Sequence, residues 1–162
     1  MKKYKFKEYK KNYTELFEKE KKKLKNILPN ANIEHIGSTA VEALGGKGVI
    51  DILISVPKKD IQIVKDKLIN AKYILSKTGG SKYRIAFHKE SGLLIRRRVH
   101  LALTHINSKI YRDAIRFRNT LRKDSKLRDK YSEIKQKAIT LGKRNKDYRD
   151  FKEKFIKEVL KR

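Results

Sequence analysis

The sequence predicts an α+β fold in which helices flank a mixed β-sheet and the C-terminal third is helical. Three observations support this prediction. Apolar residues repeat at helical spacing up to residue 28, alternate or run continuously between residues 31 and 103, and return to helical spacing after Asn107. With 162 residues, the chain is expected to form one domain over 1–162, with a helix and sheet core at 1–107 and helices at 108–162.

The opening segment is expected to form one amphipathic helix that ends before Pro29. Its apolar side chains share one face, and lysines occupy the other. The residues on the apolar face are Tyr9, Tyr13, Leu16, Phe17, Leu24, Ile27 and Leu28.

Two strands are predicted next, at 31–36 and 49–56. The second, within "VIDILISV", is continuously apolar and rich in β-branched residues, which is typical of a central strand buried on both faces. A glycine-rich turn joins the two strands. A helix over 60–71 should follow, with Asp60 as its N-cap.

From Lys72 the period changes to that of strands. The segments 72–78, 83–89 and 93–103 are separated by Gly-Gly and Ser-Gly turns, so antiparallel hairpins are expected. The last third predicts three helices, at 108–123, 125–141 and 145–161, with Gly142 as the C-cap of the second.

Composition narrows the function classes. The chain has no cysteine, which excludes disulfides, thiolate zinc sites and cysteine nucleophiles and agrees with a reducing compartment. No apolar run approaches the roughly 20 residues of a membrane span. The N-terminus is polar and lysine-rich, without the apolar core of a signal peptide. We therefore expect a cytoplasmic protein with no membrane partner.

The net charge is +26, from 44 Lys and Arg against 18 Asp and Glu. Such an excess attracts anions such as nucleic acid, nucleotides, acidic proteins or anionic lipid. Because the excess is spread over the whole chain, general lysine enrichment explains it equally well. The charge predicts weak, sequence-independent nucleic-acid binding that salt removes.

The stretch from Glu34 to Ser55 contains the residues that best predict a binding or catalytic site. Gly37 allows close approach of the backbone to a phosphate, and Ser38 and Thr39 supply amide and hydroxyl donors. Asp51, on the next strand, is a ligand of the kind that Mg²⁺ or Mn²⁺ prefers. The simpler alternative is that the Gly-Ser pair is only a turn.

These residues also resemble a known family. "EHIGSTAV" followed by "IDI" is similar to the signature of the GrpB family, and the likeness continues in order through "YRIAFHK", "VHLALT", "FRNTLRKDSKLRDKYSEIKQKA" and "YRDFKEKFIKEV". It covers the chain from about residue 10 to the C-terminus. The resemblance implies a nucleotidyltransferase-like fold.

The resemblance also implies a set of site residues. Its glycine-serine-threonine loop falls on Gly37, Ser38 and Thr39, and its strand aspartate and histidine fall on Asp51 and His100. The remaining matches, expected to bind phosphate or nucleotide, are Lys47, Arg84, Arg118 and Arg122. Glu42 and Gly48 stand where family members usually have proline, which loosens the loop.

A larger departure concerns catalysis. Active nucleotidyltransferases carry two alternating acids on the strand and a third on a later strand. This chain has Leu53 at the alternating position, with His100 and Ala102 on the later strand. One aspartate cannot readily hold two divalent ions, so the resemblance implies the fold without the reaction.

Several side chains have a second interpretation. His35, Asp51 and His100 could form an acid/base or metal cluster, with Asp51 and His100 as metal ligands, or His100 could be a structural histidine. Because successive side chains alternate along a strand, Glu34 and His35 should lie on opposite faces of the sheet. Arg118 and Arg122 could close on a triphosphate or pair with Asp113 and Asp129.

The sequence therefore supports two functional hypotheses. In the first, the protein is a metal-dependent nucleotidyl or phosphoryl transferase in which Asp51 and His100 are catalytic. In the second, the same cleft binds a nucleotide or phosphorylated small molecule, or the protein binds nucleic acid, and catalysis was lost with the second carboxylate. The approach of another carboxylate to Asp51 would distinguish them.

Overall fold

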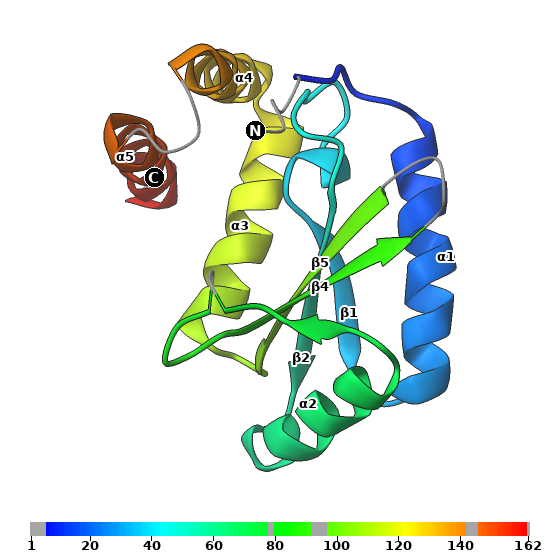
Figure 1. Ribbon diagram of the computed structural model, residues 1–162. Coiled ribbons are helices and arrows are strands. Elements are labelled where there is room, and N and C mark those ends of the chain that lie inside the picture. The colour runs from blue at the N-terminus through cyan, green and yellow to red at the C-terminus, as the bar shows by residue number, and fades with distance from the viewer. Residues whose placement is uncertain (1–5, 78–79, 92–96, 142–145, 162) are drawn as a thin grey trace.

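The computed structural model describes residues 6–77, 80–91, 97–141 and 146–161, and its strands form one mixed sheet (Figure 1). The strand order is β1-β2-β5-β4-β3. β2 and β5 run parallel, and the other three neighbouring pairs are antiparallel. The strands are β1 (Asn32–Ile36), β2 (Ile50–Val56), β3 (Ile74–Leu75), β4 (Ile85–Ser91) and β5 (Arg97–His105). This confirms the predicted α+β class.

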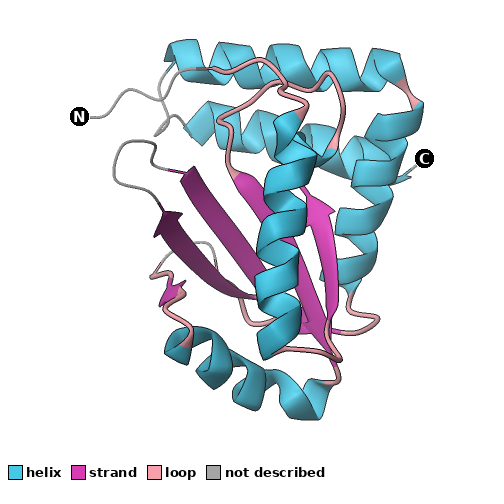
Figure 2. Ribbon diagram, turned by 90° about the vertical axis from the view of Figure 1, so that its right-hand side faces the viewer, coloured by secondary structure: helices cyan, strands magenta, loops and turns pink. Residues whose placement is uncertain are grey.

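Helices cover both faces of the sheet. α1 and α2 pack on one face, whereas α3 lies across the other, with α4 and α5 beyond it (Figures 1 and 2). The helices are α1 (Asn12–Ile27), α2 (Ile61–Asn70), α3 (Lys109–Lys123), α4 (Ser125–Leu141) and α5 (Lys146–Lys161), with short 3₁₀ helices η1 (Ser38–Ala40) and η2 (Lys58–Asp60). None of the helices within the described ranges is long and apolar enough to cross a membrane.

Most predicted elements agree with these bounds to within two residues. The segment 49–56 is the interior strand β2, buried over most of its length, as its apolar run predicted. Within residues 72–77, the described part of the predicted strand 72–78, the strand pairing with β4 is limited to Ile74 and Leu75, both exposed on the edge strand. Residues 93–96 of the predicted fifth strand, and the predicted C-cap Gly142, lie outside the described residues.

Asp60 lies at the N-cap position of α2, as predicted, but its side chain accepts no capping hydrogen bond. η2 runs directly into α2 and gives Asp60 a helical backbone. A side-chain cap instead begins α3, where the Ser108 hydroxyl accepts from Tyr111 N at 3.0 Å.

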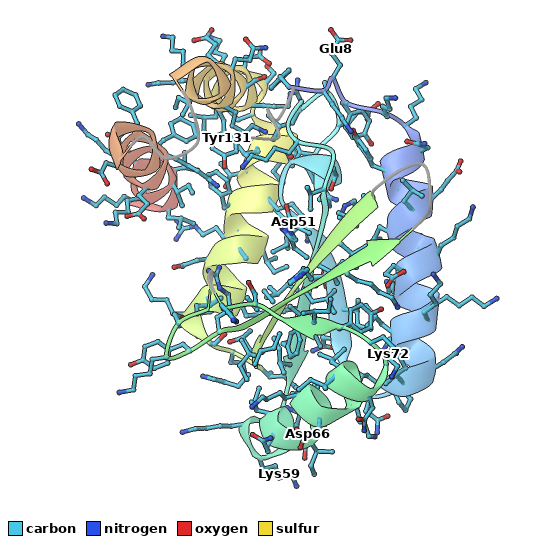
Figure 3. All side chains as sticks on the ribbon, viewed as in Figure 1. Glu8, Asp51, Lys59, Asp66, Lys72 and Tyr131 are labelled. Atoms are coloured by element: carbon cyan, nitrogen blue, oxygen red, sulfur yellow. The ribbon has the colours of Figure 1, made fainter. Side chains whose placement is uncertain are left out.

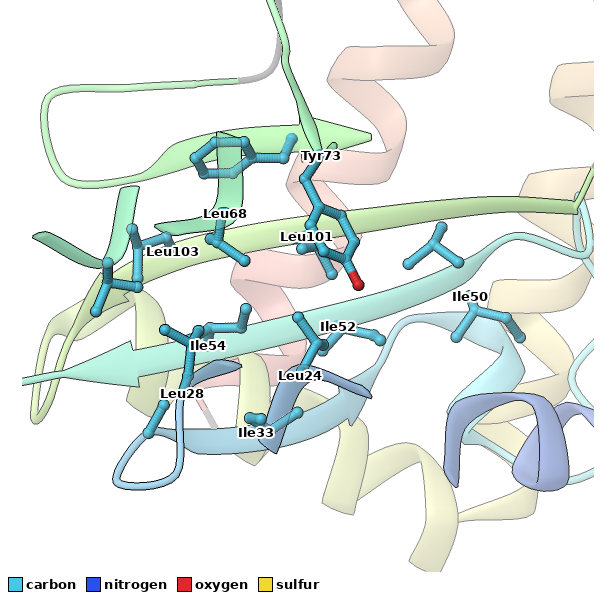
Figure 4. Packing of buried hydrophobic residues seen from close by; sticks show 14 of the residues in the cluster. Leu24, Leu28, Ile33, Ile50, Ile52, Ile54, Leu68, Tyr73, Leu101 and Leu103 are labelled. Carbon is cyan, nitrogen blue, oxygen red and sulfur yellow. The ribbon is translucent and has the colours of Figure 1, made fainter. Parts of the chain in front are cut away.

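The main core lies between the sheet and α1 and α2 (Figure 4). Alternate residues of β2 and β5 point into it, including Ile52, Ile54 and Leu101, which meet Leu24 of α1 and Leu68 of α2. The residues between them on each strand point to the other face. Because this period of two is strict, Asp51 must lie on the face away from the main core.

A second apolar cluster joins the C-terminal helices to the loop after β1. It contains Val41, Leu44, Leu121, Leu127, Tyr131, Ile134, Phe155 and Val159. Tyr131 of α4 and Phe155 of α5 stack with ring centroids 5.4 Å apart. The cluster fixes α4 and α5 against the glycine-rich loop, which brings helices distant in sequence close to Asp51.

Candidate functional site

Gly37 begins the site with a backbone conformation that favours glycine. Its φ is +74°, and a Cβ there would collide with the Asp51 carboxylate. The loop therefore turns directly over Asp51 because residue 37 has no side chain. η1 follows, with Ala40 N donating to Gly37 O at 3.3 Å.

The Thr39 hydroxyl is used inside the protein. It donates to Val49 O at 3.1 Å and so accepts from His35 Nε2 at 2.9 Å. His35 is buried on the main-core face, with its ring stacked on Phe17. Burial lowers the pKa of His35 to about 4, against the opposing Asp51 charge, so His35 is neutral near pH 7. His35 therefore helps to hold the loop in place through Thr39. The expected cluster of His35, Asp51 and His100 does not form.

Asp51 and two histidines form a row across three strands. Asp51 is the register partner of His100, which in turn is the partner of His88. His100 Nδ1 lies 3.3 Å from Asp51 Oδ1. Both side chains are partly exposed, at 51% and 34% respectively, so the pair is open to solvent. His88 is a site residue whose role sequence analysis missed.

A cleft of about 670 Å³ lies over this row. Among the residues that line it are Ile36, Gly37, Asp51, Ser76, Arg84, Ala86, His88, His100, Ala102 and Lys152. Ala86 and Ala102 are partners in the sheet, and their small side chains leave room at its floor. Asp51, His100, Gly37 and Arg84 thus lie together, as expected.

Five other expected residues are not among those lining the cleft: Ser38, Thr39, Lys47, Arg118 and Arg122. Arg118 donates from Nη1 to Glu34 Oε2 at 2.7 Å and to His35 O at 2.9 Å, since α3 crosses β1 at this point. Arg122 donates from Nε to Ala40 O at 2.9 Å. Neither arginine closes on the cleft, which was one of the two expectations for them: Arg118 bonds to β1, and Arg122 bonds to the backbone of η1.

Ser38 contacts the loop rather than the cleft wall. Its Oγ and the Lys135 Nζ both lie within 3.5 Å of the place that a Gly46 Cβ would occupy. Lys47 follows as an exposed residue. Gly46 therefore leaves space for a lysine of α4 beside the Ser38 hydroxyl.

Lys135 is a buried cation, only 9% exposed, that sequence analysis did not single out. Its Nζ donates to Gly45 O and lies 4.9 Å from the ring centre of Tyr131. Burial and the nearby Lys152 lower the pKa of Lys135 to about 7, while Asp51 opposes this shift. Burial and the Asp51 charge also raise the pKa of Tyr131. Figure 3 shows Asp51 at the part of the sheet close to Tyr131.

The donors around Asp51 do not fit a resident divalent ion. In the part of the chain that the structure describes, no group of three His, Cys, Asp or Glu side chains could hold a metal. Mg²⁺ takes about six ligands, mostly oxygen, whereas Asp51 offers one carboxylate beside an imidazole. Leu53, at the alternating position, is fully buried.

Comparisons with known proteins agree with this fold. The family model described as "GrpB protein" matches residues 3–162. A UPF0157 protein of Halalkalibacterium halodurans is 29% identical over 167 residues, which cover 96% of this chain and 80% of that protein.

Solved structures give the same result. The crystal structure of the conserved protein GrpB from Enterococcus faecalis matches with a TM-score of 0.78 at 27% identity, covering 97% of this chain and 98% of that one. A cytoplasmic RNA terminal U-transferase matches with a TM-score of 0.55 at 14% identity, over 81% of this chain and 41% of that one. At this identity the likeness concerns the fold alone, which is nucleotidyltransferase-like.

The buried Lys135 predicts a defined pH dependence of stability. Its pKa falls from 10.5 to about 7 on folding, so the unfolded chain binds more protons between these values. The unfavourable contribution of Lys135 is therefore full below about pH 7 and is relieved as pH rises toward 10.5. Relative to the wild type, Lys135→Met should be most favourable at low pH and lose that advantage as pH rises.

Urea unfolding of both proteins at about pH 6 and about pH 9.5 measures this difference. Lys137→Met, at an exposed position of the same helix, is the matched control for introducing methionine. A difference between Lys135→Met and wild type that is equal at both pH values would contradict the shifted pKa.

Proposed function

Because the chain belongs to the GrpB family, we propose that its cleft binds the phosphate group of a nucleotide or another phosphorylated small molecule. The observation that supports this proposal is the charge of the lining: Arg84, Lys152 and two histidines line the cleft together with Asp51. Guanidinium and ammonium groups form charge-assisted hydrogen bonds to phosphate oxygens. A volume of about 670 Å³ lies within the range of small-molecule sites.

The donor set favours binding over nucleotidyl or phosphoryl transfer. Two-metal transfer requires carboxylates that hold both ions. The alternating position is Leu53, and His100 occupies the register position beside Asp51 on β5. If a single Mg²⁺ or Mn²⁺ enters with a ligand, Asp51 and His100 are the side chains that would meet it. The transferase hypothesis therefore has less support than the binding hypothesis.

A thermal-shift panel tests the proposal. A nucleoside triphosphate and its unphosphorylated nucleoside are compared, each with Mg²⁺, with Mn²⁺ and with EDTA. A ligand at 100 times its dissociation constant stabilises the folded protein by about 2.7 kcal/mol. The phosphorylated compound should raise Tm while the nucleoside does not. Arg84→Gln should reduce the shift, and Arg116→Gln, at an exposed position of α3, should not. Equal shifts with nucleoside and nucleotide would contradict phosphate recognition.

The replacement Asp51→Asn separates a ligand-related role from a structural one. Asn keeps the size of the side chain and can still accept from His100, so the variant should fold with nearly the wild-type Tm. Any additional stabilisation that Mg²⁺ or Mn²⁺ gives with the nucleotide should disappear. If Asp51→Asn instead lowers Tm strongly while the remaining folded protein binds the nucleotide with unchanged affinity, the role of Asp51 is structural.

A second candidate function is weak nucleic-acid binding, supported by the +26 net charge. Neutralising several phosphates makes log affinity fall linearly with log salt. Fluorescence anisotropy with two unrelated RNA oligonucleotides should give similar affinities that drop steeply between about 50 and 200 mM salt. A preference for one sequence, or binding that persists in high salt, would indicate a specific recognition surface instead.

A further inference from the structure

The cleft is lined by two basic side chains, Arg84 and Lys152, against one carboxylate, that of Asp51. Asp51, Lys152 and Arg84 line the same cleft, and His100 Nδ1 lies 3.3 Å from Asp51 Oδ1. The Asp51 and Lys152 charges both act on Lys135, which lies behind the loop. With one carboxylate against these cations, a divalent ion would enter a positive field, whereas an anion would be attracted.

The position of Lys135 depends on two glycines and one helix. Gly45 supplies the carbonyl that accepts from its ammonium, and Gly46 leaves the space that the ammonium and the Ser38 hydroxyl share. Burying an ammonium is costly, so a buried lysine that lies beside a loop and a cleft calls for a physical explanation. Lys135 is not among the residues that line the cleft, but an anion bound there would stabilise its charged form through space.

We propose that the cleft binds a phosphate or pyrophosphate group without a divalent ion. Lys152 contacts the ligand directly, and Lys135 acts as a positioning residue. Lys152 on α5 supplies from the cleft wall the positive charge that balances the ligand, and Lys135 holds the Gly45–Gly46 segment and adds positive charge from behind the loop. This inference rests on the proposed function, because it describes the same cleft and the same class of ligand.

The arrangement also gives the C-terminal helices a functional part. The sheet contributes Asp51 and His100, and Arg84 directly precedes β4, whereas both lysines come from helices packed around Tyr131 and Phe155. A ligand held between them would contact both parts of the fold. Binding should therefore stabilise the packing of α4 and α5 as well as the cleft.

The test measures binding of inorganic pyrophosphate and ATP by calorimetry at constant ionic strength, in EDTA and in Mg²⁺. We expect affinities in EDTA within about threefold of those in Mg²⁺. Lys152→Gln should weaken binding about tenfold in both conditions, the value of one charge-assisted hydrogen bond of about 1.4 kcal/mol. Lys154→Gln, at an exposed position of the same helix, should leave the affinity unchanged.

The role of Lys135 is tested with a conservative pair of variants. Lys135→Met, which removes the positive charge, should weaken pyrophosphate binding. Lys135→Arg, which keeps the charge, should retain part of the affinity that Lys135→Met loses. If Lys135 only filled space, the charge of its replacement would not affect the affinity. Thermal unfolding of each variant confirms folding first. If Lys135→Met does not fold, the Lys152→Gln and Lys154→Gln pair decides the proposal.

The outcomes separate the two proposals. Binding that requires Mg²⁺ overturns metal-free recognition and leaves the proposed function intact. Binding in EDTA that Lys152→Gln does not weaken overturns the assignment of the lysine. If neither pyrophosphate nor ATP binds in either condition, the proposed function fails and this inference fails with it.

Discussion

The contact between Gly37 and Asp51 is the constraint on which the site depends. Asp51 lies on an interior strand whose neighbours along the chain are apolar, and its carboxylate occupies the space where a side chain at residue 37 would be. The Asp51 side chain remains 34% exposed on the cleft side, where His100 Nδ1 lies 3.3 Å from its Oδ1. The turn at Gly37 and the His100 contact therefore form around this one carboxylate without burying it.

The partners come from two separately packed parts of the chain. The main core fixes the sheet against α1 and α2, which sets the register of Asp51 and His100. The second cluster fixes α4 and α5 against the glycine-rich loop, which sets Lys135 and Lys152. Arg118 and Arg122 join these parts by bonding to β1 and to the loop backbone. A replacement that loosens the second cluster should therefore disturb the site without disrupting the sheet.

The sequence predicted the sheet better than the site, for a physical reason. Strands and helices have periods of two and 3.6, so the continuous run around Asp51 and the return of helical spacing after Asn107 were sufficient to order the elements. Lys135 could not be recognised, because it is one of 44 Lys and Arg residues and its burial depends on contacts with Gly45, 90 positions earlier. Arg118 matched the expected spacing but pairs with Glu34, a contact that helical spacing cannot predict.

The packing around Leu53 disfavours a second acid at this position. Leu53 follows Asp51 by two residues, so it lies on the same face of β2, between its register partners Glu34 and Ala102. Its side chain is fully buried, whereas that of Asp51 is 34% exposed. A carboxylate at position 53 would lose its hydration, and Arg118, the nearest arginine contact on β1, already pairs with Glu34. An acid at position 53 would therefore be buried within the sheet, so the packing that buries Leu53 disfavours an acid pair beside Asp51.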